Sequence, residues 1–243
     1  MTFVSIFDMY TIGVGPSSSH TVGPWRIVQQ FVHDLRQGDH LGATRRLRFD
    51  LLGSLALTGK GHATDRAVAL ALLGHDPETV DVGAIDHYLS DLHHHGVVEI
   101  DGFSVPFDPT QDIRFLTSER HPAHANVIRC LALGPGDREQ YVREYMSIGG
   151  GFIGDVNHPE ANDFPDRPLP PHPVERAADL ERYCREHGAR VSDIVRANEA
   201  AWFDDADLIP RTKRIWDAMR QSIVRGCQTA GVLPGGLDVQ RRD

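Results

Sequence analysis

Apolar residues first recur with a helical period just after Thr21. Steps of three and four residues place the apolar positions on one face of an amphipathic helix. These positions are Trp25, Val28, Phe31, Val32 and Leu35. Gly38 follows them as a natural helix stop. Residues 1–15, ahead of this helix, are apolar and then glycine-rich, which predicts a strand or turn that leads into a loop.

The pattern then alternates between strand and helix periods. Residues 45–52 alternate charged and apolar side chains, which is typical of a half-buried strand. Residues 53–65 are punctuated by glycine and show little periodicity. Apolar spacing predicts helices over 63–73 and 81–95.

The pattern favours strands again in the next fifty residues. Short β-rich runs occupy 97–100, 113–116, 126–133 and 140–147. The last two flank the tetrapeptide GPGD, which is typical of a hairpin turn. We therefore expect an α/β (α+β) domain over residues 1–155.

A cluster of prolines marks the end of this domain. We interpret residues 156–173 as a linker, because proline, asparagine and aspartate dominate it. An all-helical segment, 174–243, should follow, with helices near 175–187, 192–204 and 209–226. Ser192 is the expected N-cap of the second, and Pro210 fits the first turn of the third. An apolar stripe on the third helix consists of Trp216, Met219 and Ile223.

Composition narrows the class of protein. The chain has 243 residues, 40% of them hydrophobic, with a formal charge of −9, which argues against nucleic-acid and anionic-membrane partners. There is no apolar run long enough to span a bilayer and no signal-peptide pattern at the start. We therefore expect a cytoplasmic protein. The three cysteines are sparse and odd in number, which fits neither a disulfide framework nor a metal-binding motif.

The stretch GPSSSHT, residues 15–21, lies directly before the first predicted helix. Its hydroxyls and the unpaired N–H groups of a helix start would converge there, which favours binding of a carboxylate or phosphate. Capping of the helix by a single serine, with the other side chains solvated, is the alternative.

The stretch GKGHATD places His62 between a glycine-rich turn and a predicted helix. A histidine at a helix N-terminus tends to be neutral, and a neutral imidazole near a substrate is a candidate general base. A structural or surface histidine is the alternative. Thr64 or Asp65 could cap that helix, and Lys60 could bind an anion or remain solvated.

Two further stretches carry weaker signals. The three glycines of SIGGGF, residues 147–152, would let the backbone approach a ligand closely, but their spacing matches neither a P-loop nor a dinucleotide fingerprint. The run His93–His95 suggests a metal by composition only, and a solvated helix end is the favoured interpretation.

Together, SIFDMYTIGVGPSSSHTVGPW, GSLALTGKGHATD, YMSIGGGF and GVLPGGL resemble the iron–sulfur L-serine dehydratase family in the same order and over nearly the whole chain. The resemblance implies conversion of L-serine to pyruvate and ammonia with a [4Fe–4S] cluster whose ligands lie outside this chain. It further implies that the chain consists of a β domain and the first helices of a catalytic α domain, the rest of which is missing here. The implied ligand is L-serine, and the implied assembly is a homodimer.

The resemblance also implies roles for individual residues. His62 would be the catalytic base that removes the α-proton. The implied substrate-binding residues are Ser17, Ser18, Ser19, His20, Thr21, Lys60, Thr64, Gly149 and Gly150.

The family's β domain is similar to the allosteric substrate-binding domain of some phosphoglycerate dehydrogenases, which keeps a purely regulatory, serine- or anion-binding module open. A separate β subunit of a two-chain enzyme is a further possibility, against which the helices after residue 174 argue.

Overall fold

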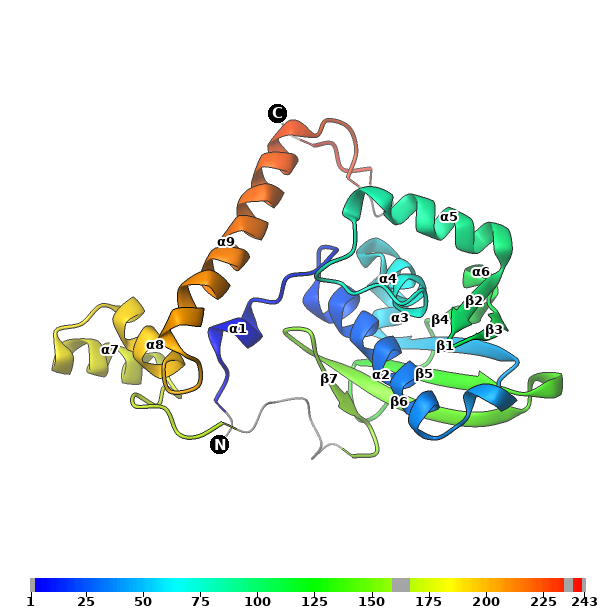
Figure 1. Ribbon diagram of the computed structural model, residues 1–243, viewed down its shortest axis with the longest axis horizontal. Helices are drawn as coiled ribbons and strands as arrows, with labels where there is room; N and C mark the ends of the chain where they lie inside the picture. The colour runs from blue at the N-terminus through cyan, green and yellow to red at the C-terminus, as the bar shows by residue number, and fades with distance from the viewer. Residues whose placement is uncertain (1–2, 159–166, 234–237, 242–243) are drawn as a thin grey trace. The chain divides into compact units, whose positions relative to one another are not determined.

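The computed structural model describes residues 3–158, 167–233 and 238–241 (Figure 1). They divide into two compact units: Ile12–Asp163 with Gly231–Arg242, and Met1–Thr11 with Phe164–Ala230 and Asp243. Residues 159–166 of the expected proline-rich linker lie outside the described residues, as do residues 234–237 of GVLPGGL. The domain boundaries inferred from the sequence stay a prediction.

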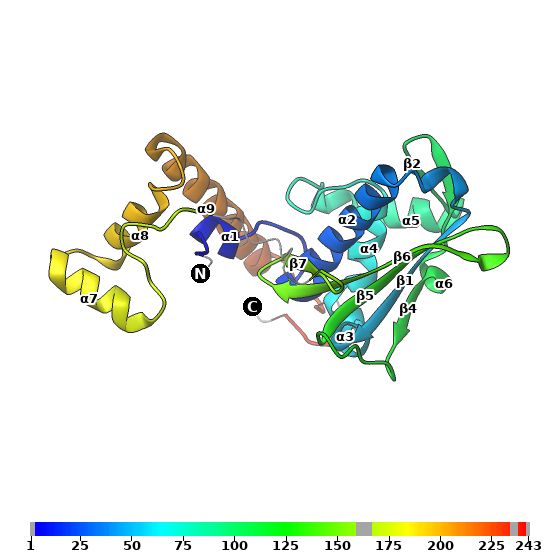
Figure 2. The same cartoon turned by 90° about the horizontal axis from the view of Figure 1, so that it is seen from below.

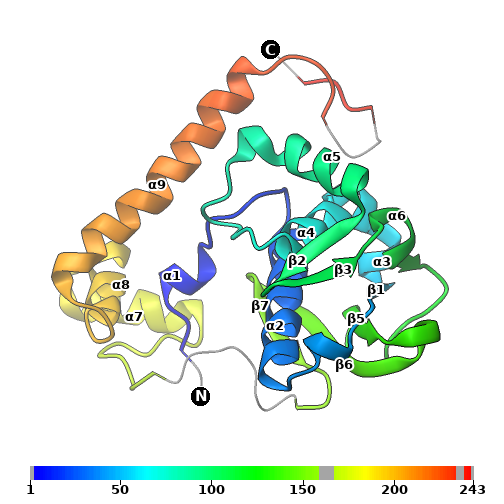
Figure 3. The ribbon, with the colours of Figure 1, turned by 45° about the vertical axis from the view of Figure 1, so that its right-hand side comes forward.

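The larger unit is built on a mixed five-stranded sheet of order β4-β1-β5-β6-β7. Its strands are β1 (Arg46–Gly53), β4 (Ile113–Leu116), β5 (Asn126–Leu133), β6 (Glu139–Gly149) and β7 (Phe152–Asp155). β1 and β4 are parallel, and every other neighbouring pair in this sheet is antiparallel. A separate two-stranded ribbon, β2 (Val97–Ile100) and β3 (Phe103–Pro106), follows helix α5 (Ile85–His95) (Figure 3).

Helices α2 (Gly23–Gln37) and α4 (Thr64–Leu72) lie on the same side of this sheet (Figure 2). The unit also contains α3 (Ser54–Thr58), α5 (Ile85–His95) and α6 (Pro109–Asp112). As the sequence predicts, α2 ends at Gly38, which is its C-cap.

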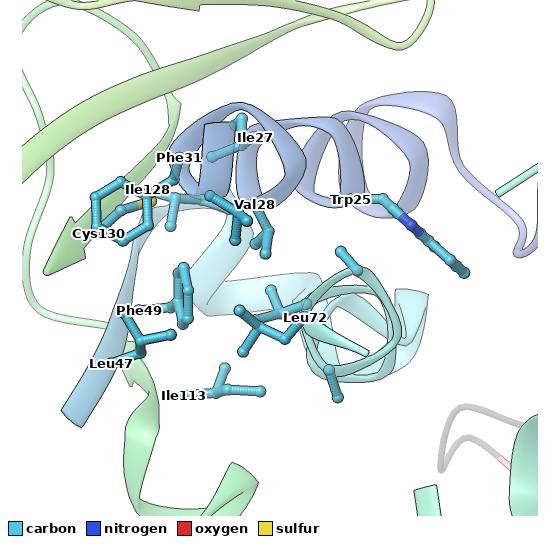
Figure 4. Packing of buried hydrophobic residues seen from close by; sticks show 14 of the residues in the cluster. Trp25, Ile27, Val28, Phe31, Leu47, Phe49, Leu72, Ile113, Ile128 and Cys130 are labelled. Carbon is cyan, nitrogen blue, oxygen red and sulfur yellow. The ribbon is translucent and has the colours of Figure 1, made fainter. Parts of the chain in front are cut away.

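The core lies between α2, α4 and the sheet (Figure 4). Alternate residues of β1, Leu47, Phe49 and Leu51, are fully buried. The Phe49 ring meets that of Phe31 on α2 edge to face, with centroids 6.0 Å apart. Burial of each such side chain stabilises the fold by about 1.5–3 kcal/mol, so this core fixes α2 over the sheet.

Charged side chains pair across neighbouring strands. Asp50 on β1 is 1% exposed and accepts two hydrogen bonds, of 2.6 and 2.5 Å, from Arg114 on β4. Arg129 on β5 donates to Glu144 on β6 over 2.8 Å. Both pairs join residues that lie directly opposite each other in the strand register.

The prediction of a mixed α/β domain is confirmed, as are the helices over 63–73 and 81–95, the strands and the GPGD hairpin. The similarity to the allosteric domain of phosphoglycerate dehydrogenases stays a prediction. Two short strands, β3 and β7, were not predicted from the sequence.

The expected strand or turn near the N-terminus is wrong. Residues Ile6–Met9 form the short helix α1, because Ser5 caps it and exchanges hydrogen bonds with Asp8 in a capping box. The stretch 53–65, which shows little periodicity in the sequence, also contains a short helix, α3. Gly53, at φ 57° and ψ −125°, turns the chain out of β1 and lets α3 begin at once.

The smaller unit is helical, with α7 (Ala177–His187), α8 (Val191–Glu199) and α9 (Asp205–Gln228). The buried carboxylate of Glu199 holds α1 in this unit. It accepts hydrogen bonds from the Ser5 hydroxyl over 2.5 Å and from the Ile6 N–H over 2.9 Å. No helix among the described residues is long and apolar enough to cross a membrane.

Two predicted helix starts in this unit are wrong. The N-cap of α8 is Arg190, and Ser192 is the second helical residue; the Asp193 carboxylate accepts from the Arg190 N–H over 3.0 Å instead. Asp205 begins α9, so Pro210 lies inside the helix, where it removes one main-chain donor. The predicted stripe exists, and the exposed fractions of its members are 55% for Trp216, 43% for Met219 and 59% for Ile223.

Candidate functional site

The serine-rich stretch forms a π-helical turn, Ser18–Val22, that runs directly into α2. Ser17 caps it: its hydroxyl accepts from the main-chain N–H of His20 over 3.2 Å. Gly15, at φ 97°, is required here, because a Cβ at this position would lie 2.6 Å from the Thr21 side chain. One serine therefore caps the turn, and the others are placed beside it.

The GKGH stretch forms a 3₁₀ turn, Gly59–His62, that precedes α4. Ala63 adopts the left-handed conformation at φ 55° to join the two, at a cost of about 1–2 kcal/mol. A Cβ at Gly59 would lie 3.0 Å from the Thr64 hydroxyl. The strained conformation of Ala63 thus places His62 directly before α4.

Two threonines clamp these turns together. The Thr21 hydroxyl donates to the carbonyl of His62 over 2.9 Å, and the Thr64 hydroxyl donates to the carbonyl of His20 over 2.5 Å. Both threonine side chains are buried. Each hydroxyl proton is thus committed to a main-chain carbonyl, so the structure gives these residues a positioning contact, and their expected role as substrate ligands stays a prediction.

The clamp brings the imidazole rings of His20 and His62 to a centroid separation of 4.8 Å. The Nδ1 atom of His62 lies 2.9 Å from the carbonyl oxygen of Thr58. Because a carbonyl can only accept, Nδ1 carries the proton. In the neutral ring Nε2 then holds the lone pair, which is the state that a general base requires.

His20 has a hydroxyl at each ring nitrogen. Ser19 Oγ lies 2.9 Å from Nδ1, and Ser54 Oγ lies 3.0 Å from Nε2. Burial lowers the pKa of His20, the neighbouring charge of His62 lowers it further, and a hydrogen bond with the Ser54 backbone opposes both effects. His20 is therefore disposed to be neutral and hydrogen-bonded.

The SIGGGF stretch contacts the serine turn through Ser147. The fully buried Ser147 donates to the carbonyl of Ser19 over 2.8 Å. A Cβ at Gly23 would lie 2.0 Å from the Ser147 hydroxyl, so only glycine fits there. Gly149 and Gly150 have positive φ, at the turn from β6 into β7. Their expected contact with substrate stays a prediction.

Lys60 lies apart from the histidine pair. Its ammonium group lies 3.6 Å from the Asp65 carboxylate and 4.9 Å from the Phe115 ring centroid. It lines a cavity of about 310 Å³ whose lining includes neither His20 nor His62. The expectation that Lys60 binds substrate is not supported by any contact with the serine turn and stays a prediction.

Sequence reasoning missed three residues near the site: Ser54, Ser147 and Asn126. The Asn126 amide donates to the carbonyl of Ser147 over 3.3 Å, and among the described side chains its Oδ1 is a buried oxygen without a hydrogen-bond partner. The only sequence signal for Ser54 was its place directly after Gly53, and nothing in the pattern singled out Asn126.

An iron–sulfur cluster does not fit the side chains that the structure describes. Within the described ranges, no group of three histidine, cysteine or acidic residues could hold a metal ion. Cys130 is buried, Cys184 is half-buried and Cys227 is exposed. The histidine run occupies the last turn of α5, where His95 Nδ1 bonds the Asp91 carbonyl over 2.8 Å, as expected for a solvated helix end.

The arrangement therefore combines three serine hydroxyls, two imidazoles and a buried amide oxygen. Hydroxyl groups can bind the carboxylate of a small substrate, and the Nε2 lone pair of His62 can accept a proton from it. This is chemistry suited to proton abstraction from a small polar acid.

Known proteins resemble the chain over nearly its whole length. A family model described as the serine dehydratase beta chain matches residues 5–158. L-serine dehydratase 2 of Escherichia coli is 40% identical over 241 residues, which cover 98% of this chain and 52% of that protein. L-serine dehydratase of Streptomyces coelicolor is 36% identical, with 98% and 53% covered. The chain thus spans about half the length of the curated relatives it matches.

Proposed function

The chain belongs to the serine dehydratase beta chain family, and on that premise we propose that it supplies the substrate-side residues of an L-serine dehydratase. The reaction converts L-serine to pyruvate and ammonia. The observation that carries this proposal is the histidine pair. The Nδ1 proton of His62 is fixed by the Thr58 carbonyl, its ring centroid lies 4.8 Å from that of His20, and His20 in turn contacts the Ser19 hydroxyl.

Loss of water from L-serine requires two events. The α-proton must be removed although it is weakly acidic, and hydroxide must depart although it is a poor leaving group. His62 Nε2 takes the α-proton, and the Thr58 carbonyl stabilises the imidazolium that forms through the Nδ1–H contact. The bond between the β-carbon and the hydroxyl breaks, and the departing hydroxide together with the proton taken by His62 makes one molecule of water. The enamine that remains rearranges to an imine, and a second water then releases ammonia and pyruvate.

The serine turn holds the substrate in this proposal. The hydroxyls of Ser17 and Ser19 face the substrate carboxylate, with Ser18 beside them in the turn. Ser147 and the threonine clamp keep the turn in place, because their hydroxyls donate to main-chain carbonyls. A rigid turn lowers the entropy that the site loses when the substrate binds.

The resemblance implies a [4Fe–4S] cluster, which would act as Lewis acid on the substrate hydroxyl in the complete enzyme. Its ligands do not come from the described side chains. We assign them to a catalytic α domain that corresponds to the other half of the relatives. Assembly as a homodimer and a cytoplasmic location stay predictions.

A purely regulatory module is not favoured, because both the family model and the relatives carry the dehydratase name. The discriminating experiment supplies L-serine to this chain joined to, or co-expressed with, the α domain of a relative, under anaerobic conditions. We expect pyruvate and ammonia in equal amounts. Binding of L-serine without product, in a preparation that retains its cluster, would support the module and contradict the dehydratase.

Ser19→Ala tests the substrate-binding part of the proposal in the same assay. Loss of a hydroxyl that binds the carboxylate should raise KM by roughly 10- to 100-fold, since a hydrogen bond to a charged group contributes about 1.5–3 kcal/mol. Ser90→Ala, at an exposed position on α5, is the matched control. An unchanged KM for Ser19→Ala would remove this residue from the carboxylate site.

A further inference from the structure

We propose that one apolar face of helix α9 is a docking surface for the half of an L-serine dehydratase that this chain does not match. The face consists of Ile209, Trp216, Met219 and Ile223, and we call it the α9 stripe. The inference rests on the proposed function for the identity of the partner, whereas the exposed stripe itself is a feature of this chain alone.

The α9 stripe is a continuous row on one side of the helix. Its members follow one another at steps of seven, three and four residues, which is the spacing of neighbours on one helix face. The row is about 21 Å long, since a helix rises 1.5 Å per residue. The exposed fraction of its side chains is 62% at Ile209 and 43–59% at the other three. Single exposed apolar residues are ordinary, but a contiguous row marks an interaction surface.

Helix α9 buries very little against the described parts of the chain. Of its 24 residues, Asp205–Gln228, Leu208 alone is buried within the described ranges. Helix α2, by contrast, has 15 residues and buries more than half of them. Helices in proteins gain most of their stability from the packing of an apolar face. A helix as long as α9 therefore calls for a surface from outside the described chain to cover its apolar row.

Basic side chains border the α9 stripe. Lys213 and Arg220 lie three residues before and four residues after Trp216, on the same edge of the row. Over residues 211–225 the helix carries five basic residues and one acidic residue, Asp217, although the whole chain has a formal charge of −9. A basic rim around an apolar row is complemented by an apolar groove with an acidic rim.

The same charges disfavour two other occupants. In an antiparallel pair of α9 helices from two copies of the chain, like edges meet, so Lys213 of one copy would face Arg220 of the other and repel it. An anionic membrane attracts a basic amphipathic helix, but it repels a chain with a formal charge of −9. A groove on a different polypeptide meets neither obstacle.

The relatives supply that polypeptide. L-serine dehydratase 2 of Escherichia coli matches this chain over 241 residues, which are 52% of its length. The remainder, which we call the unmatched half, has no counterpart in this chain. A helix with an apolar row commonly binds by laying that row into a groove. Docking of α9 into the unmatched half would join this chain to the part of the enzyme to which we assign the cluster ligands.

Oxidative labelling by hydroxyl radicals tests the docking. The experiment compares the 243-residue chain with the same chain joined to the unmatched half, and mass spectrometry locates the oxidised residues. Trp216 and Met219 should be labelled readily in the chain alone. Both should lose most of their labelling in the joined protein, because a docked apolar row excludes water. Phe103, which is 44% exposed on β3, is the control and should be labelled equally in both.

A charge placed in the α9 stripe should undo the docking. Burial of an unpaired carboxylate in an apolar interface is costly, so the joined Ile223→Asp protein should show Trp216 and Met219 labelled nearly as in the chain alone. Val191→Asp, at a position 53% exposed on α8, adds the same charge outside the stripe and should keep the protection. Because Ile223 is exposed, its variant should fold, which circular dichroism of the 243-residue chain verifies.

Four results would overturn the inference. One is unchanged labelling of Trp216 and Met219 in the joined wild-type protein, and another is equal protection in Ile223→Asp and Val191→Asp. Labelling that falls as the chain alone is concentrated, in step with a dimer in sedimentation velocity, would assign the stripe to a second copy. Labelling that falls when phosphatidylserine vesicles are added to the chain would assign it to a membrane.

The labelling needs no turnover, so the inference and the proposed function fail separately. A joined protein with a protected α9 stripe that forms no pyruvate from L-serine would contradict the proposed function and leave the docking intact. A joined protein that forms pyruvate while Trp216 and Met219 remain fully labelled would contradict the docking and leave the proposed function intact.

Discussion

The rings of His20 and His62 lie 4.8 Å apart between centroids, although they come from two separate turns at the starts of different helices. Each turn holds the histidine of the other turn. Thr21, next to His20, donates to the His62 carbonyl, and Thr64, close to His62, donates to the His20 carbonyl. The geometry of the pair therefore depends on the two hydroxyls as well as on the rings.

The threonine clamp should contribute measurably to stability. Thr21→Val removes a buried hydroxyl and leaves the His62 carbonyl without this donor, which should lower the free energy of unfolding by about 1–3 kcal/mol. Urea denaturation of the variant measures it. Thr79→Val, at an exposed position, is the control and should stay close to the wild type. Equal midpoints for both variants would show that the clamp does not hold the turns.

Acid should weaken the fold through His20. Burial, followed by the charge of His62, lowers the pKa of this residue below its ordinary value of 6.5. Unfolded His20 therefore binds a proton before the folded residue does. The contribution of neutral His20 to the free energy of unfolding is fully present above pH 6.5. It is lost as the pH falls from 6.5 toward the pKa of His20 in the folded protein.

Denaturation of the wild type and of His20→Gln over a pH series that brackets 6.5 tests this dependence. We expect the loss of stability on acidification to be smaller in His20→Gln. The exposed His87→Gln should retain the wild-type slope. The expectation is contradicted if His20→Gln and wild type lose stability in parallel.

The Asp50–Arg114 pair should matter far more than surface pairs. Arg114→Met leaves a carboxylate that is 1% exposed without its partner, which should cost about 3–5 kcal/mol. Arg36→Met breaks a pair with Asp101 whose side chains are 45% and 50% exposed, and should cost about 0–1 kcal/mol. Thermal or urea unfolding compares the two, and similar losses would be inconsistent with the burial of Asp50.

The three cysteines should differ sharply in reactivity. Burial raises the pKa of the Cys130 thiol well above its ordinary value, and the nearby carboxylate of Asp50 adds to the effect. Because thiolate is the reactive form, Cys130 should resist an aromatic disulfide reagent until the chain unfolds. The exposed Cys227 should react first. Mass spectrometry locates the label, and native-state modification of Cys130 would contradict the packing of β5.

The sequence predicted those parts of the fold that a local period determines. The stripe from Trp25 to Leu35 and the alternation over 45–52 both predict elements that are present, although β1 is half-buried only in its first residues and buried throughout from Phe49 to Gly53. Helices α1 and α3 were missed because they are one turn long and depend on a cap at Ser5 and a left-handed turn at Gly53. Periodicity does not register elements of that length.

The candidate site was predictable in part. Glycine-flanked His62 and the serine run were visible as local motifs. The roles of Thr21, Thr64 and Ser54 were not, because their partners lie in other segments and only the packing of α2, α4 and β1 brings them together. Lys60 is the opposite case. It belongs to the same GKGH motif as His62, yet its side chain contacts Asp65 and Phe115 and not the histidine pair.

The central claim is that His62 removes the α-proton of L-serine. Its most direct test is pyruvate formation from L-serine by the complete enzyme that carries His62→Asn, with His87→Asn as the control on the surface of α5. General-base catalysis contributes about 10²–10⁴-fold, so we predict a fall in kcat of at least roughly 100-fold with little change in KM. A kcat equal to that of the wild type, in a variant that retains its fold and cofactor, would contradict the account.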